Sequence, residues 1–295
     1  MVMNMLITLG QQETSLAWEY RRSGDKSYEE GKFAEAIAFY DLALEIDADA
    51  PEIWNSRGLS LCRMGRNSDA IDSFDKALEL DPGYIDAWNN KGVVLYKIAR
   101  YLEAISYFDK IISMMPAYAK AWYNKGVVLG KMGKYLQAIE NYDKTIEINA
   151  QRPKVWNNKG AALGNLGRYD EAIQCFDRAI ELEPKNAEAW NNRGAALGKL
   201  GRYRESMDCL DHAIDIDPEY FEAWCNKGEA LRRQDKYEEA IRHYDKAIEI
   251  HPRYSKAWSS KGLALKALGR EAECVAAFAQ AEALISKSES RSYGS

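Results

Sequence analysis

Five asparagines recur at intervals of 34 residues through the middle of the chain: Asn90, Asn124, Asn158, Asn192 and Asn226. A primary amide carries both a donor and an acceptor, so it can pair with the N–H and C=O groups of a peptide backbone. Asparagine is also unfavourable inside a helix, so five copies in register need a reason. We expect this row to bind an extended polypeptide; the alternative is that the amides pack against their own neighbouring helices or hold water.

Three lysines lie close to this row in the sequence. Lys120 and Lys154 are 34 residues apart, and Lys131 lies between them. If these ammonium groups share a surface with the asparagines, they favour a partner segment of acidic character. The alternative is that they are simply solvated at helix ends. We predict a peptide-binding site made of the five asparagines and these three lysines.

No arrangement of residues predicts catalysis. His212, His243 and His251 show neither an HExxH motif nor a pair at i, i+4, so we expect scattered exposed side chains. Cys225 should face the binding surface, but no histidine accompanies it to generate a thiolate. The segment Gly126–Lys131 lacks the spacing and the Ser or Thr of a phosphate-binding loop. We therefore predict a protein without enzymatic activity, cofactor or metal site.

The elements that carry these residues follow the same period. Seven tryptophans, from Trp54 to Trp258, are spaced by 34 residues, and a glycine stands four residues after each. A fixed period of this size indicates a repeat array. With the tryptophan at position 4, eight repeats run 17–50, 51–84, 85–118, 119–152, 153–186, 187–220, 221–254 and 255–288. We expect residues 1–16 to form an extension before the first helix and residues 289–295 to form a polar tail.

Each repeat is predicted to form two helices. In the third repeat, the apolar side chains of Asp86–Ile98 share one stripe, and a second stripe runs from Ala104 to Ile112. A proline such as Pro116 then ends the second helix, because it cannot continue the hydrogen-bond ladder. No segment shows sustained strand alternation, so the fold is predicted to be all-α.

The repeat resembles the tetratricopeptide repeat (TPR) family, whose pattern places Trp at position 4, Gly at 8, Ala at 20, an aromatic residue at 24, Ala at 27 and Pro at 32. The fifth repeat supplies Trp156, Gly160, Ala172, Phe176, Ala179 and Pro184. This resemblance covers nearly the whole chain. It implies an α-α superhelix, a TPR solenoid of eight helix-turn-helix repeats, that acts as a protein–protein interaction scaffold or adaptor.

In this family the first helices of the repeats line the ligand groove. Helical spacing places positions 2, 5, 6, 9, 12 and 13 of the repeat on one stripe of the first helix, with the asparagine row at position 6. That row is similar to the one that lines the TPR superhelix of O-GlcNAc transferases. Neighbouring helices lie about 8–10 Å apart and an extended peptide advances about 3.3 Å per residue. One amide would therefore meet about every third residue of the partner.

Two further rows carry opposite charges. Position 7 is Lys or Arg in every repeat except the first, which has Ser23, and position 25 is Asp in every repeat except the last, which has Ala279. The two missing charges stand at opposite ends of the array, as expected if each Asp pairs with the basic residue sixteen positions later, as in Asp41 with Arg57. We predict a ladder of seven such inter-repeat ion pairs and an array complete at eight repeats; the alternative is that both rows are solvated.

Composition and charge restrict the class of partner. The 295-residue chain has 40 Lys plus Arg against 45 Asp plus Glu, a net charge of −5, which disfavours nucleic acid as a partner. No apolar stretch reaches the length of a membrane span. Five cysteines without a CxxC pair fit a reducing compartment. We expect a cytoplasmic protein that binds neither nucleic acid nor membrane. The alternatives to partner binding are a homo-oligomer formed through the terminal repeat and a regulatory subunit of an enzyme encoded elsewhere.

Overall fold

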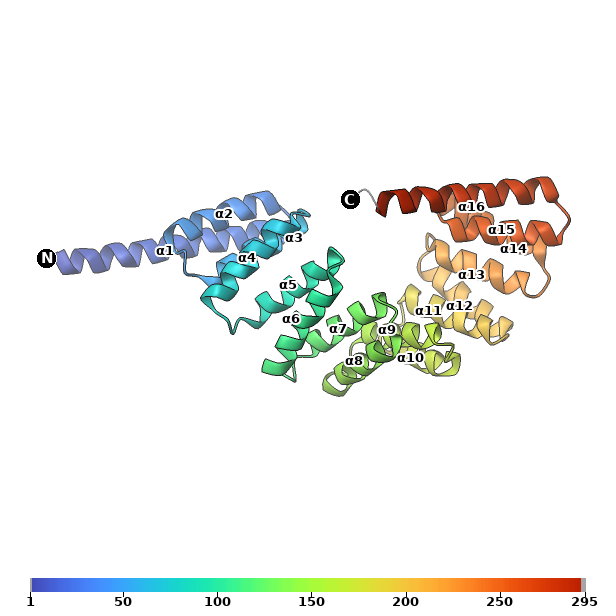
Figure 1. The fold of residues 1–295 in the computed structure, drawn as a ribbon, viewed down its shortest axis with the longest axis horizontal. Helices are drawn as coiled ribbons and strands as arrows, with labels where there is room; N and C mark the ends of the chain where they lie inside the picture. The colour runs from blue at the N-terminus through green and yellow to red at the C-terminus, as the bar shows by residue number, and fades with distance from the viewer. Residues whose placement is uncertain (1, 293–295) are drawn as a thin grey trace. The chain divides into compact units, whose positions relative to one another are not determined.

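A computed structural model of the protein describes residues 2–292, with side chains described for residues 15–286. Within residues 2–292 the chain forms α-helices and no strands, which confirms the all-α prediction. The helices belong to two units, which meet in the sequence between Ile148 and Asn149, and each unit consists of successive antiparallel helix pairs (Figure 1).

The first unit contains α1 (Val2–Glu29), α2 (Phe33–Ile46), α3 (Pro51–Arg63), α4 (Asn67–Leu80), α5 (Ile85–Lys97), α6 (Tyr101–Met114), α7 (Ala119–Lys131) and α8 (Tyr135–Ile148). The second unit contains α9 (Pro153–Asn165), α10 (Tyr169–Leu182), α11 (Ala187–Lys199), α12 (Tyr203–Ile216), α13 (Phe221–Arg232), α14 (Tyr237–Ile250), α15 (Ser255–Ala267) and α16 (Glu271–Ser292). Odd-numbered helices are the first helices of the repeats, and even-numbered helices are the second helices.

A glycine at position 15 makes the turn between the two helices of most repeats. Gly167 has φ +77°, a left-handed conformation that glycine adopts without steric cost. The turn lets the backbone N–H groups of Gly167 and Arg168 donate to the carbonyls of Gly164 and Leu163, each at 3.0 Å. These bonds satisfy carbonyls that the end of α9 would otherwise leave unpaired.

The tryptophan at position 4 ties each repeat to the loop before it. In all seven cases the indole N–H donates to the backbone carbonyl six residues earlier, as in Trp190 to Pro184 at 2.9 Å. α10 ends at Leu182, two residues before Pro184, as predicted from the proline. The tryptophans therefore fix where these first helices start relative to the loops that precede them.

The glycine at position 8 lets the two helices of a repeat approach closely. A Cβ atom at Gly126 would lie 2.6 Å from Cε1 of the Tyr142 ring on α8, and Tyr142 is buried. The equivalent glycines of the other repeats face the side chain at position 24 in the same way. This contact forms the centre of each repeat's core.

Both ends of the helical array are longer than predicted. α1 begins at Val2, so residues 2–16 belong to the first helix and do not precede it. α16 continues to Ser292, so residues 289–292 of the expected tail are helical; residues 1 and 293–295 lie outside the described part. No proline interrupts residues 2–29, and neither glycine nor proline interrupts residues 271–292, so the helical hydrogen bonds continue past the repeat boundary.

Candidate functional site

Asn90, Asn124, Asn192 and Asn226 are hydrogen-bonded to asparagines of the preceding repeat. Each amide Nδ2 donates to Oδ1 of the position-5 asparagine in the preceding repeat. The pairs are Asn90–Asn55 (2.9 Å), Asn124–Asn89 (2.8 Å), Asn192–Asn157 (3.1 Å) and Asn226–Asn191 (2.8 Å). We call these four pairs the asparagine zipper. Its position-5 members are buried, so each needs a polar partner, and the next repeat supplies it.

The zipper corrects the expectation of an amide row reserved for a partner. A primary amide has two N–H donors, and the zipper uses one of them at each position-6 asparagine. Oδ1 of Asn226 also accepts a bond from Nζ of Lys256 at 3.2 Å. Asn158, on α9, is half-buried. The amides therefore join repeats first, and what they retain for a partner is a second N–H.

Position 5 itself does not line the groove, contrary to the expectation from helical spacing. Cys225 occupies this position in the seventh repeat and is completely buried. Burial raises the pKa of the Cys225 thiol to about 11, so it is protonated at neutral pH. The prediction that Cys225 faces the binding surface is wrong, because the next repeat covers this position.

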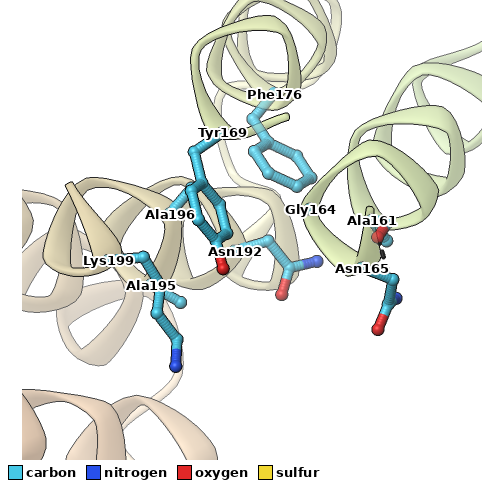
Figure 2. Close-up of a pocket in the computed structure, with 9 residues that line it drawn as sticks. All are labelled: Ala161, Gly164, Asn165, Tyr169, Phe176, Asn192, Ala195, Ala196 and Lys199. Atoms are coloured by element: carbon cyan, nitrogen blue, oxygen red, sulfur yellow. Dashed lines mark hydrogen bonds between the residues drawn. The ribbon is translucent and has the colours of Figure 1, made fainter. Parts of the chain in front are cut away.

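An open pocket of about 430 Å³ lies on the first helices of repeats 5 and 6. It is lined by Ala161, Gly164, Asn165, Tyr169, Phe176, Asn192, Ala195, Ala196 and Lys199 (Figure 2). Positions 6, 9, 12 and 13 of the repeat thus contribute, as predicted. A Cβ atom added to Gly164 would meet no atom within 4 Å, so this position opens directly onto the pocket. Figure 2 shows the Asn192 side chain directed from α11 toward α9.

A second pocket, of about 370 Å³, continues the first along α11, α13 and α15. Both are lined by Ala195 and Lys199, so the two pockets together form one channel, which we call the first-helix groove. Glu229 lies in the second pocket and accepts hydrogen bonds from Arg232 and Arg233. Burial alone would raise the pKa of Glu229, but the two guanidinium groups outweigh it and hold the pKa below its usual value.

The three predicted lysines do not line these pockets. Lys120 is exposed, with Nζ 5.9 Å from the centre of the Tyr118 ring. Lys131 is exposed at the end of α7, and Lys154 is exposed in the first turn of α9. Lys120 and Lys131 belong to the first unit and Lys154 to the second. Their role in binding stays a prediction.

The ion-pair ladder is confirmed at six of its seven predicted steps. The pairs are Asp41–Arg57, Asp109–Lys125, Asp177–Arg193 and Asp245–Lys261, each at 2.6 Å, with Asp75–Lys91 and Asp211–Lys227. The basic side chains are 9–24% exposed and the aspartates 43–50%. The seventh, Asp143 with Lys159, would join the two units and stays a prediction. Because these charges are satisfied between repeats, the ladder is a structural feature and not a ligand site.

The histidines are partners of aromatic rings. His212 lies 4.7 Å from Trp190, and His251 lies 4.5 Å from Phe221 between ring centres. His243 stacks at 5.6 Å on the ring of Trp224. It is half-buried, and burial together with nearby Lys227 lowers its pKa. The expectation of exposed histidines therefore fails for His243, because the tryptophan row offers a packing surface to the second helices.

No three His, Cys, Asp or Glu side chains described here gather so as to hold a metal ion. Nor does any described helix combine the length and the apolar character that crossing a membrane requires.

Comparison with solved structures returns repeat proteins of the same architecture. MamA is 33% identical over 56% of this chain and 96% of its own, with a TM-score of 0.51. A tetratricopeptide repeat protein from Parabacteroides merdae ATCC 43184 is 16% identical over 85% of this chain and 99% of its own (TM-score 0.67). YrrB, a TPR protein with an unusual peptide-binding site, is 24% identical over 65% of this chain and 98% of its own (TM-score 0.53). The last two identities show a shared fold alone.

Among curated proteins, none matches the chain. Family models match in consecutive segments. Tetratricopeptide repeat models match residues 85–118, 119–151, 153–186, 187–220 and 221–254, and a TPR repeat model matches residues 24–65 and 58–99. Between residues 85 and 254 these matches follow the helix pairs of the structure, and together the matches cover well over half of the chain. The protein therefore belongs to the tetratricopeptide repeat family.

Proposed function

We propose that the first-helix groove binds an extended segment of a partner protein, so that the chain acts as an interaction scaffold or adaptor without enzymatic activity of its own. TPR proteins generally mediate protein–protein interactions. The observation that carries the proposal is the open volume along four consecutive first helices, α9, α11, α13 and α15.

Small side chains create this volume. Positions 9 and 12 of repeats 5 and 6 are Ala161, Gly164, Ala195 and Gly198, and all four line the groove. A bulky residue at Gly164 would fill space that a guest chain could occupy, because no atom lies within 4 Å of its Cβ position. Small residues in a groove floor admit main-chain atoms as well as side chains, which suits an extended polypeptide better than a compact ligand.

The asparagine row keeps a role in this proposal. At Asn192 and Asn226 the zipper fixes the orientation of the amide, and each retains an N–H that a peptide carbonyl can accept. Because neighbouring repeats hold these amides in place, little side-chain entropy is lost when a partner binds. Asn90, Asn124 and Asn158, with Lys120, Lys131 and Lys154, are the further contacts proposed, in repeats 3, 4 and 5.

Filling the groove without disturbing the fold tests the proposal. In Gly164→Met the new side chain enters the pocket, because no atom lies within 4 Å of the Cβ position, and the helix gains propensity. The matched control is Gln174→Met, on the exposed face of α10. In co-purification from the native cell, we expect Gly164→Met to lose proteins that the wild type and the control retain. Equal retention by all three would exclude the groove as the binding site.

Self-association through the last repeat is the second candidate. A pocket of about 370 Å³ is lined by Trp258, Leu265 and Ala276, among others, and Val275, which is 67% exposed, lies on another face of α16. If this face joins two copies, the solution mass rises with protein concentration and Val275→Lys abolishes the rise. Leu136→Lys, at a residue 62% exposed on α8, is the control. A mass that stays monomeric at all concentrations would exclude this candidate.

A further inference from the structure

The second pocket of the first-helix groove is positively charged, whereas the molecule as a whole is negatively charged. Among the residues that line it, Lys199, Arg232, Arg233 and Lys256 are cationic and only Glu229 is anionic. The chain as a whole carries a net charge of −5. A concentration of positive charge in a hollow of an acidic protein attracts anions.

The carboxylate of Glu229 positions the two arginines without neutralising both. Arg232 donates through Nε and Nη2 to both carboxylate oxygens, at 2.9 and 2.8 Å, and Arg233 donates through Nε to Oε1 at 2.8 Å. A guanidinium has five N–H donors, so each arginine keeps donors for a second acceptor. The pair is held in place before any ligand arrives, which reduces the entropy that binding costs.

Two lysines complete the ring of donors from the neighbouring repeats. Lys256, in the first turn of α15, donates to Asn226 at 3.2 Å and has two further N–H groups. Lys199, at the end of α11, lines both pockets of the groove. Between these cations the lining is small, with Gly194, Gly198 and Ala230. The result is a space of about 370 Å³ with donors converging from three first helices.

We propose that this pocket binds an anionic side chain of the partner segment, either an Asp or Glu carboxylate or a phosphorylated serine. Both present oxygen acceptors that match the fork of a guanidinium group. The inference rests on the proposed function, since the pocket is part of the groove. It places an acidic part of the partner at repeats 6–8, in addition to the one that Lys120, Lys131 and Lys154 favour at repeats 4 and 5.

A defined peptide set tests this assignment. The probes are immobilised 12-residue peptides with Glu, phosphoserine, Gln or Lys fixed at the centre and the other positions randomised. We compare the wild type with Arg233→Gln/Lys256→Gln, at two exposed pocket residues. The control, Lys236→Gln/Lys246→Gln, removes the same charge from residues outside the pocket. Thermal melting by circular dichroism checks that all three proteins fold.

We expect the wild type and the control to select Glu or phosphoserine over Gln at least fivefold, and the pocket variant to lose this selection. The ratio of the Glu and phosphoserine arms identifies the preferred source of the anion. Equal weakening of both variants would overturn the proposal, because it would indicate general charge attraction. Binding that ignores the central residue but disappears in Gly164→Met would overturn the anion pocket and leave the groove intact. No binding to any peptide would overturn both.

Discussion

At the residue scale, two glycines one turn apart on α7 are expected to respond to the same substitution with opposite sign. Gly126→Ala places a Cβ atom 2.6 Å from Cε1 of Tyr142, which is buried and cannot withdraw, so we expect a loss of about 1–3 kcal/mol from overpacking. Gly130→Ala brings the Cβ atom only to 3.6 Å from the Tyr142 hydroxyl. It should stabilise the helix by up to about 1 kcal/mol.

Urea unfolding of the two variants checks this pair. The comparison is internally controlled, because helix, repeat and substitution are the same. A shift of both variants in one direction would show that the separation of α7 and α8 adapts to the added methyl group.

At the same scale, the ion pairs of Glu229 are expected to make the free energy of unfolding depend on pH. Arg232 and Arg233 hold the pKa of Glu229 in the folded protein below the usual range of a glutamate, so its ion pairs contribute stability at neutral pH that is lost as pH falls through the folded-state pKa. Glu229→Gln should lower the free energy of unfolding at pH 7 by an amount on the order of 1 kcal/mol. The difference from the wild type should shrink steadily below about pH 4.

Unfolding measured from pH 7 to pH 3 checks the prediction for Glu229. Glu249→Gln, at an exposed carboxylate that pairs with Lys246, serves as the control and should change stability little at any pH. A difference between Glu229→Gln and the wild type that does not depend on pH would mean that the loss comes from packing rather than charge.

The sequence predicted a contact well where the first and last repeats lack the residue that would have had no partner. The ladder followed from Ser23 and Ala279, which stand where a charge would have had no partner. The zipper had a comparable signal, because asparagine doublets such as Asn89–Asn90 and Asn191–Asn192 recur with the period. Helical spacing alone could not tell which member is buried, since that depends on how the next repeat packs over the helix.

At the element scale, the steps of the ladder should differ in strength. Lys91 is 9% exposed beside Asp75, whereas Lys125 is 21% exposed beside Asp109. Burial would lower the pKa of Lys91, but hydrogen bonds to Asp75 and Tyr107 outweigh it, and the pKa is raised. Removing Asp75 therefore leaves a nearly buried ammonium without its carboxylate, which costs more than losing an exposed partner.

Double-mutant cycles with Asp→Asn and Lys→Met substitutions measure this difference. We expect a coupling of about 1 kcal/mol or more for Asp75 with Lys91, and about 0.2–0.5 kcal/mol for Asp109 with Lys125. Equal couplings in the two cycles would show that burial does not decide the strength of a step. Zero coupling in both would reduce the ladder to incidental contacts.

Helix boundaries inside the array were predictable to within a residue, and those at its ends were not. The spacing placed a helix at Asp86–Ile98, and α5 spans Ile85–Lys97. Turn glycines and prolines recur in most repeats, so the period itself marks where a helix stops. Beyond the first and last repeats no such turn residues recur, and in the described part of the chain α1 begins at Val2 and α16 reaches Ser292.

At the scale of the whole molecule, contacts are local along the chain. Within each described unit, a helix packs only against the next helix and the next but one. Stability in such an array is a sum of repeat terms and nearest-neighbour terms. Damage to one repeat should therefore spread to its neighbours and decline with distance along the sequence, whereas a single shared core would transmit it everywhere.

Gly228→Ala is expected to destabilise the seventh repeat and so to test this. Its Cβ atom would lie 2.6 Å from Cε1 of Tyr244 and 3.1 Å from the Ala240 carbonyl, and Tyr244 is completely buried. We expect amide hydrogen exchange to accelerate in α11–α16, most strongly in α13 and α14, while α1–α4 keep their wild-type rates. Uniform acceleration would mean that the chain unfolds as one cooperative block. The description by repeat and nearest-neighbour terms would then be wrong, because a partner bound to repeats 5–8 would stabilise every helix equally.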